Sequence, residues 1–284
     1  DADFTGHAAM AANRWIASHW FMFFGNDLDR SVALAGEAVE LDPESGWAHV
    51  MATFAAVLSG RADDARETAA DARERARDAG ERAGVFIAMG TALLRPGDIG
   101  GATRMADDFV AWAEERRFPS AMAMALFVRG QTLTEQQPAE ALRTFERALT
   151  HIRAEIPGCW NVETLIRRDM IPLVHRSSPG DAPALALVAL RSCVRHNETG
   201  NIAELFAHVA TVLADVGHPE FAARAVGAAG GSLRSPTIAA TVENTKDRLR
   251  AALGDRYDGH VAEGSGSSAM RTARSIIDLL ETTA

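Results

Sequence analysis

The sequence predicts an all-α protein built from stacked pairs of helices, and three observations support this fold class. Apolar residues recur three and four positions apart, which is the helical period, and runs of β-branched residues are rare. Short breaks of glycine, proline and aspartate separate helical segments of about 12 to 18 residues. Small residues that follow these breaks recur at intervals of 34, 37 and 39 residues, a period that is typical of helix-pair repeats.

The repeat ranges follow from these breaks and from small residues a few positions after them. The breaks are Gly25-Asn26-Asp27, Gly60-Arg61-Ala62-Asp63, Gly97-Asp98 and Gly217-His218-Pro219, and the small residues are Ser31, Ala65, Ala102, Ala141 and Ala222. The last interval between the small residues covers about two periods, which implies a degenerate repeat within it. Repeats are therefore expected at residues 12–43, 46–79, 83–117, 121–157, 158–197 and 200–233.

Proline marks the ends of individual helices. An apolar stripe from Val32 to Leu41 stops at Asp42-Pro43, since proline disfavours the helical conformation in the residue before it. A second stripe, from Ala139 to Ile152, stops near Pro157-Gly158. Residues 1–235 are thus expected to form the repeats. We expect residues 236–284 to form C-terminal capping helices, because the end of a stack needs a polar outer face.

Small and large residues follow a recurring pattern where helices are expected to cross. The pattern is clearest at Phe86, Gly90, Ala102, Ala106 and Phe109 in the third range and at Gly130, Ala141, Phe145 and Ala148 in the fourth. It resembles the tetratricopeptide (TPR) repeat, in which helices A and B cross closely over glycine and alanine. The resemblance implies a TPR-like right-handed superhelix of about six antiparallel helix pairs, closed by C-terminal capping helices.

The TPR resemblance also implies a concave groove that is lined by fixed positions of helix A. Counted on this chain, the candidate ligand or partner groove consists of Trp20, Phe23, Phe24, Trp47, Val50, Phe54, Val57, Thr91, Arg95, Phe127 and Gln131. Aromatic side chains supply a large contact area at a small entropic cost, so they are common binding anchors. A protein or an apolar small molecule is the expected occupant. Alternatively, the N-terminal aromatic residues pack within the stack or against a further domain.

The C-terminal part resembles a narrower group of proteins. Ala223–Ala229, Leu249–Gly254 and Ala262–Gly264, followed by a last helix, are similar to the end of actinobacterial ATP-dependent signal-transduction proteins of the STAND class. That group includes MalT/LuxR-type transcription regulators and ATPases fused to adenylate cyclase domains. The resemblance implies a helical sensor or partner platform, with an attached ATPase domain upstream.

Charge and motifs argue against several other functions. The formal net charge of −9 disfavours direct binding to nucleic acid or to an anionic membrane. The only lysine, Lys246, lies outside any glycine-rich phosphate loop, and the nine histidines show no metal-binding spacing. We therefore expect no cofactor, no metal and no catalytic residue. The two cysteines, Cys159 and Cys193, and the lack of an apolar run long enough to span a bilayer indicate a cytoplasmic protein.

The expected function is binding rather than catalysis. We expect a non-catalytic sensor or scaffold domain of a larger ATP-dependent signalling or transcription regulator. It binds a small-molecule inducer or a protein partner, and this binding changes the state of the attached regulator. Two alternatives stay open: a stand-alone TPR adaptor that binds a peptide segment of a partner, and an enzyme on an α-helical scaffold. An enzyme would need a pocket of convergent polar groups with perturbed pKa values.

Overall fold

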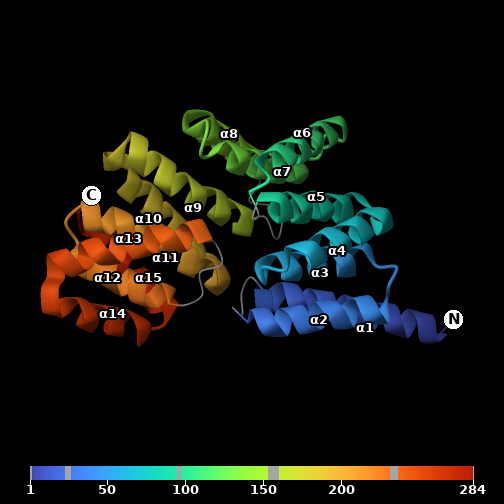
Figure 1. Ribbon diagram of the computed structural model, residues 1–284, viewed down its shortest axis with the longest axis horizontal. Helices are drawn as coiled ribbons and strands as arrows, with labels where there is room; N and C mark the ends of the chain where they lie inside the picture. The colour runs from blue at the N-terminus through green and yellow to red at the C-terminus, as the bar shows by residue number, and fades with distance from the viewer. Residues whose placement is uncertain (1, 23–26, 95–96, 153–159, 231–235, 284) are drawn as a thin grey trace. The chain divides into compact units, whose positions relative to one another are not determined.

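The computed structural model describes residues 2–22, 27–94, 97–152, 160–230 and 236–283 (Figure 1). Every regular element within these ranges is a helix, so the prediction of an all-α protein is confirmed. Consecutive helices pack against each other as pairs, in agreement with the expected number of about six. The handedness of the superhelix stays a prediction.

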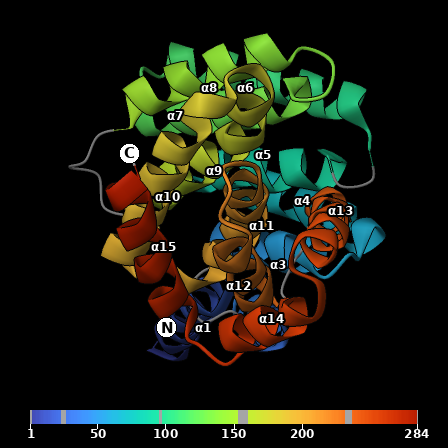
Figure 2. The same cartoon turned by 90° about the vertical axis from the view of Figure 1, so that its left-hand side faces the viewer.

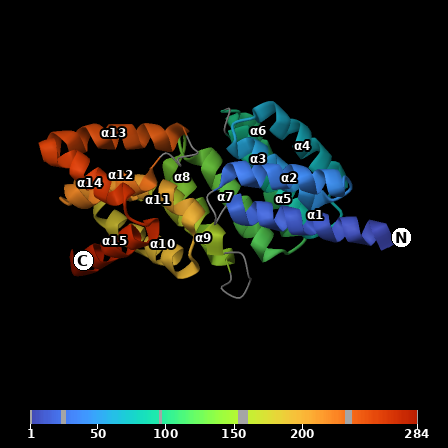
Figure 3. The same ribbon diagram turned by 90° about the horizontal axis from the view of Figure 1, so that it is seen from below.

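The helices form two compact units, Asp1–Ile156 and Pro157–Ala284. The first unit contains four pairs, which are α1 (Ala2–Trp20) with α2 (Leu28–Leu41), α3 (Gly46–Leu58) with α4 (Ala62–Arg75), α5 (Ala79–Leu94) with α6 (Ile99–Glu115), and α7 (Pro119–Leu133) with α8 (Pro138–His151). The first helices of successive pairs also contact each other, so the pairs stack side by side. Figure 3 shows this stacking for α1, α2 and α3.

The second unit begins with two further pairs and continues with three more helices. The pairs are α9 (Trp160–Ser177) with α10 (Ala182–His196) and α11 (Thr199–Asp215) with α12 (Pro219–Ala229), followed by α13 (Pro236–Leu253), α14 (Tyr257–Ser265) and α15 (Ala269–Thr283). Short 3-10 helices occupy Pro179–Asp181 and Gly254–Arg256. Helix α13 packs against α11 and α12, α14 packs mainly against α12, and α15 packs against α10, α11 and α12 (Figure 2). The boundary at residue 235 between repeats and capping helices stays a prediction.

Glycine conformation explains why several helices end where the breaks are predicted. Gly60, Gly97 and Gly217 have φ angles of 75°, 84° and 85°, in the left-handed region that residues with a side chain rarely adopt. A new helix then begins two residues after each glycine. After Gly97, for example, the carboxylate of Asp98 accepts a hydrogen bond from the Gly101 N–H at 2.8 Å and caps α6.

Small residues form the seams of the first unit. Ala102, Ala141 and Ala148 have no exposed surface. A Cβ atom on Gly130 of α7 would lie 2.3 Å from the ring of Phe145 on α8, so the ring rests directly on the α7 backbone. This contact confirms the expectation that paired helices cross closely over glycine and alanine.

Another close crossing joins α12 and α14 in the second unit. A Cβ atom on Gly227 would lie 2.1 Å from the carbonyl oxygen of Val261, and one on Gly264 would lie 2.0 Å from the carbonyl oxygen of Arg224. The Ser265 hydroxyl donates a hydrogen bond to the Gly227 carbonyl at 3.0 Å. The two backbones are therefore in contact, and neither glycine position has room for a side chain.

Substitution of Gly227 by alanine tests this crossing. Because the added methyl group meets backbone rather than a flexible side chain, we expect Gly227→Ala to destabilise the protein by about 1 to 3 kcal/mol. Thermal unfolding followed by circular dichroism measures the change. The control is Gly259→Ala on α14, where an added Cβ meets no atom within 4 Å, so the melting temperature should stay the same or rise. A wild-type melting temperature for Gly227→Ala would contradict the close crossing.

Candidate functional site

The predicted groove residues on α3 hold neighbouring helices together. Trp47 stacks on Trp15 of α1, with ring centroids 5.4 Å apart and an interplanar angle of 17°. Phe54 packs against two apolar clusters that connect α3 with its neighbours. Val50 and Val57 have exposed fractions of 0% and 3%. These side chains therefore belong mainly to the interior of the stack.

The approach of α5 explains the burial of Val50 and Val57. A Cβ atom on Gly84 of α5 would lie 3.0 Å from Cγ1 of Val50, so α5 covers this part of α3. Val57 packs in one cluster with Ala92 of α5. Both valines are therefore buried in the seam between successive first helices instead of lining an open groove, and their contribution is to stability.

The other predicted groove residues that the structure describes are dispersed over three helices. Trp20 at the end of α1 is 53% exposed, and Phe127 on α7 is 8% exposed, so Phe127 is also part of the interior. Thr91 and Gln131 are half-buried. The remaining three predicted residues, Phe23, Phe24 and Arg95, lie outside the described residues.

A cavity in the first unit provides a better candidate for a binding site. It has a volume of about 420 Å³ and is formed by the end of α4, by α5 and by α6. Its lining consists of Arg73, Ala76, Arg82, Val85, Phe86, Met89, Met105, Asp108 and Trp112. A volume of this size lies in the usual range for ligand sites, about 300 to 1,000 Å³.

Aromatic rings and methionines give the cavity an apolar floor. Phe86 stacks on Phe109 with centroids 4.7 Å apart, and the Trp112 ring lies 5.8 Å from the Phe86 ring. Met89 and Met105 also line the cavity, and both are half-buried. Stacked rings form a rigid surface, whereas the flexible thioether side chains adapt to the shape of what they contact.

Polar groups without partners surround this floor. Arg73 and Arg82 are exposed, and neither guanidinium forms a salt bridge within the part of the chain that the structure describes. Asp108 contributes a carboxylate from α6. The indole Nε1 of Trp112 is buried and has no hydrogen-bond acceptor among the described residues. The cavity thus combines apolar contact with free charged groups.

No single sequence motif identifies this cavity, because its lining comes from three helices. A partial signal nevertheless exists. Phe86 and Met89 are three positions apart on α5, and Met105 and Trp112 are two turns apart on α6, so each pair lies on one face of its helix. The contact between α5 and α6 then brings the two faces together.

The second unit contains a buried network of charged side chains. Arg168 of α9 forms ion pairs with Asp169 at 2.7 Å and with Glu204 of α11 at 2.5 Å, and its side chain is 9% exposed. Burial opposes the charge of Arg168, but the two carboxylates outweigh this effect and raise its pKa. The network joins α9 to α11 by charge pairing, since a buried charge is tolerated only when it is paired.

The groups around this network are buried as well. Thr164 of α9 donates a hydrogen bond to Glu198 at 2.9 Å, and neither residue has exposed surface. Burial and the charge of Glu198 raise the pKa of the Cys193 thiol, which therefore stays protonated and unreactive. Burial, with the charge of Arg168, lowers the pKa of His208 to about 4. The network accordingly has the properties of a structural element.

The described residues contain neither a cluster of metal ligands nor a membrane-spanning helix. None of their His, Cys, Asp and Glu side chains form a group of three or more that could hold a metal ion. Among the described helices, none is both long enough and apolar enough to cross a membrane. The expectation that the chain needs no cofactor stays a prediction.

The neutral state of His208 has a measurable consequence. An unfolded histidine binds a proton below its ordinary pKa of 6.5, whereas folded His208 stays neutral until the pH approaches 4. The unfolded state therefore binds more protons in this window, and stability falls as the pH falls. When the pH is lowered from 7 to 5, we expect the free energy of unfolding of the wild type to fall by about 2 kcal/mol more than that of His208→Gln. Chemical unfolding at both pH values measures this; equal losses would show that folded His208 takes up protons normally.

Comparisons with known proteins add a distant structural likeness. No family model matches the sequence, and no curated protein matches it. Among solved structures, that of pilF from Pseudomonas aeruginosa is similar, with a TM-score of 0.48 and 13% sequence identity over 91% of this chain and 99% of that chain. A likeness this distant assigns neither a partner nor an activity. None of these comparisons supports the relation to MalT/LuxR-type regulators.

Proposed function

We propose that this chain is a non-catalytic protein-binding scaffold, and that the cavity between α4, α5 and α6 receives an apolar side chain from a partner segment. The observation that carries this proposal is the combination of an apolar floor with unpaired charged groups around it. Interfaces bind through apolar anchors that fill pockets, and a polar rim surrounds these anchors.

A protein segment fits this cavity better than a small molecule does. Arg73, Arg82 and Asp108 are exposed, so the lining alone leaves part of an occupant in contact with solvent. A larger partner supplies the missing cover itself, and the adaptable Met89 and Met105 suit apolar side chains of different shapes.

The charges indicate which sequence the partner segment carries. Arg73 and Arg82 can each donate charge-assisted hydrogen bonds to a carboxylate, which are stronger than neutral hydrogen bonds. A partner with an apolar anchor flanked by Asp or Glu therefore matches this side of the cavity. Asp108 favours a basic residue on the part of the segment that lies over α6.

The non-catalytic part of the proposal draws on the buried ionisable groups. Arg168, Asp169 and Glu204 are paired with one another and line neither of the two cavities described for this chain. Catalytic acids and bases, in contrast, need access to a substrate. The observed pairing favours a structural role over acid–base chemistry.

The proposal extends to the setting in which the scaffold works. We place it in the cytoplasm because the chain has only two cysteines, and we regard it as the sensor region of a larger ATP-dependent regulator on the basis of the C-terminal sequence resemblance. The sequence of the natural reading frame tests this setting. A glycine-rich phosphate loop with its lysine upstream of Asp1 would support it, and a frame without an ATPase domain would favour the stand-alone adaptor.

Peptide selection tests the binding cavity directly. Peptides selected from a random display library on the whole chain should share an apolar residue flanked by acidic residues. We expect Met105→Asp to weaken the binding of these peptides about ten-fold or more, because a charge in the apolar floor would be desolvated on binding. Fluorescence anisotropy measures the affinities, and circular dichroism checks the fold.

A matched substitution separates this effect from a general loss of binding. Met10 of α1 is 47% exposed and does not line the cavity, so Met10→Asp should leave the affinities unchanged. Arg82→Gln should weaken the acidic peptides and reduce the salt dependence of their binding. Selected peptides that bind Met105→Asp as tightly as the wild type would contradict the proposed site.

A further inference from the structure

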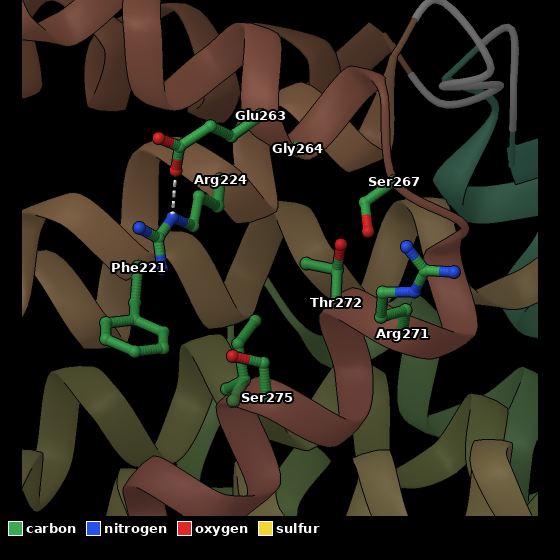
Figure 4. Close-up of a pocket in the computed structure, with 9 residues that line it drawn as sticks. Phe221, Arg224, Glu263, Gly264, Ser267, Arg271, Thr272 and Ser275 are labelled. Carbon is green, nitrogen blue, oxygen red and sulfur yellow. Dashed lines mark hydrogen bonds and ion pairs between the residues drawn. The ribbon is translucent and has the colours of Figure 1, made fainter.

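The second unit contains a separate, smaller pocket between α12, α14 and α15, shown in Figure 4. Its volume is about 210 Å³. This is below the usual range for sites of drug-sized ligands, about 300 to 1,000 Å³, so the pocket suits a smaller molecule. The pocket lies beside the crossing of Gly227 with α14, because Gly264 forms part of its wall.

The hydroxyl of a mostly buried threonine has no partner within the described part of the chain and points into this pocket. Thr272 in the first turn of α15 is 6% exposed, and its hydroxyl forms no hydrogen bond with any described residue. Other helical threonines, for example Thr53 and Thr91, donate to the carbonyl four residues earlier. In Figure 4 the hydroxyl oxygen of Thr272 instead points toward Ser267, across the space that the lining residues enclose. An unpaired hydroxyl that is open to the pocket can hydrogen-bond to a bound ligand.

One positive charge at the pocket is not compensated. The Arg224 guanidinium forms an ion pair with Glu263 at 2.7 Å and lies 5.1 Å from the centre of the Phe221 ring, as Figure 4 shows. Arg271 also lines the pocket, but its guanidinium forms no ion pair within the described ranges. The charges of Arg224 and Glu263 balance, so Arg271 leaves the pocket with an excess of one positive charge.

The remaining walls are partly apolar. Phe221 of α12 and Ile276 of α15 line the pocket together with the polar groups. An occupant therefore needs one end that accepts hydrogen bonds and carries negative charge, and another end that tolerates apolar contact. The position of the first turn of α15 adds to the preference for an anion, because helix N-termini favour negative charge.

We propose that this pocket binds a compact monocarboxylate, whose carboxylate contacts Thr272 and Arg271 and whose apolar part contacts Phe221 and Ile276. A singly charged anion matches the single uncompensated positive charge. A doubly charged phosphate fits less well, since the Glu263 carboxylate lines the same small pocket and repels added negative charge. This inference goes beyond the proposed protein-binding function and uses no residue of the α4–α6 cavity.

Benzoate is a suitable probe, because it joins one carboxylate to one small apolar ring. Ligand-observed NMR with the whole chain measures its dissociation constant, and benzamide serves as the uncharged analogue of the same shape. We expect saturable binding of benzoate, with benzamide at least ten-fold weaker. Equal affinity for the two compounds, or no saturable binding of benzoate, overturns the proposal. Inorganic phosphate serves as a competitor of benzoate. If phosphate binds with a lower dissociation constant than benzoate does, the choice of a carboxylate is overturned.

Substitutions locate the binding to this pocket. Thr272→Val removes the hydroxyl at nearly constant shape, and Arg271→Gln removes the charge, so each should weaken benzoate about ten-fold or more. Thr272→Ser keeps a hydroxyl and should retain most of the affinity. Arg274→Gln is the matched control, because Arg274 is exposed on the same helix and does not line the pocket. A similar loss in Arg274→Gln, or wild-type affinity in Thr272→Val, overturns the assignment.

Discussion

Close contact between helix backbones is the constraint on which the rest of this structure depends. A helix pair of this size cannot bury its apolar surface alone, so it relies on its partner and its neighbours. The glycine at position 130 lets the Phe145 ring reach the α7 backbone, and the glycine pair at positions 227 and 264 brings α12 and α14 together. Since interiors are close-packed, one added methyl group at Gly227 or Gly264 meets backbone atoms and displaces a helix rather than a single side chain.

The need for close contact between helices also explains which sequence-based predictions the structure confirms. Helix periodicity and the spacing of breaks predict the helix pairs well, because both signals are local. Local signals do not predict which of the groove residues on α3 are buried. Whether Val50 faces a groove or a neighbouring helix depends on how closely α5 approaches, and Gly84 permits a close approach. That distance is a property of two repeats together, and no position within one repeat encodes it.

In the second unit, several polar residues that contact each other across neighbouring helices are about one repeat period apart in the sequence. Arg168 and Glu204 are 36 residues apart, and Thr211 and Thr245, whose hydroxyls lie 2.9 Å apart, are separated by 34 residues. Both separations equal about one repeat period. For Arg168 and Glu204 the reason is that the successive first helices α9 and α11 lie side by side. Complementary polar residues one period apart are therefore a sequence criterion for contacts between repeats. Single-residue inspection misses this criterion, since each residue alone resembles an ordinary surface residue.

The pocket of the second unit follows from the same glycine contact that holds α12 to α14. Gly264 places the preceding residue, Glu263, at the edge of the crossing, and Gly227 places Arg224 one helical turn away on the opposite helix. The resulting ion pair closes one side of the pocket. After Ser267 the chain turns into α15, whose first turn supplies Thr272 to the interior. A side chain at either glycine would separate the two helices, so the shape of this pocket and the packing of the second unit depend on the same two residues.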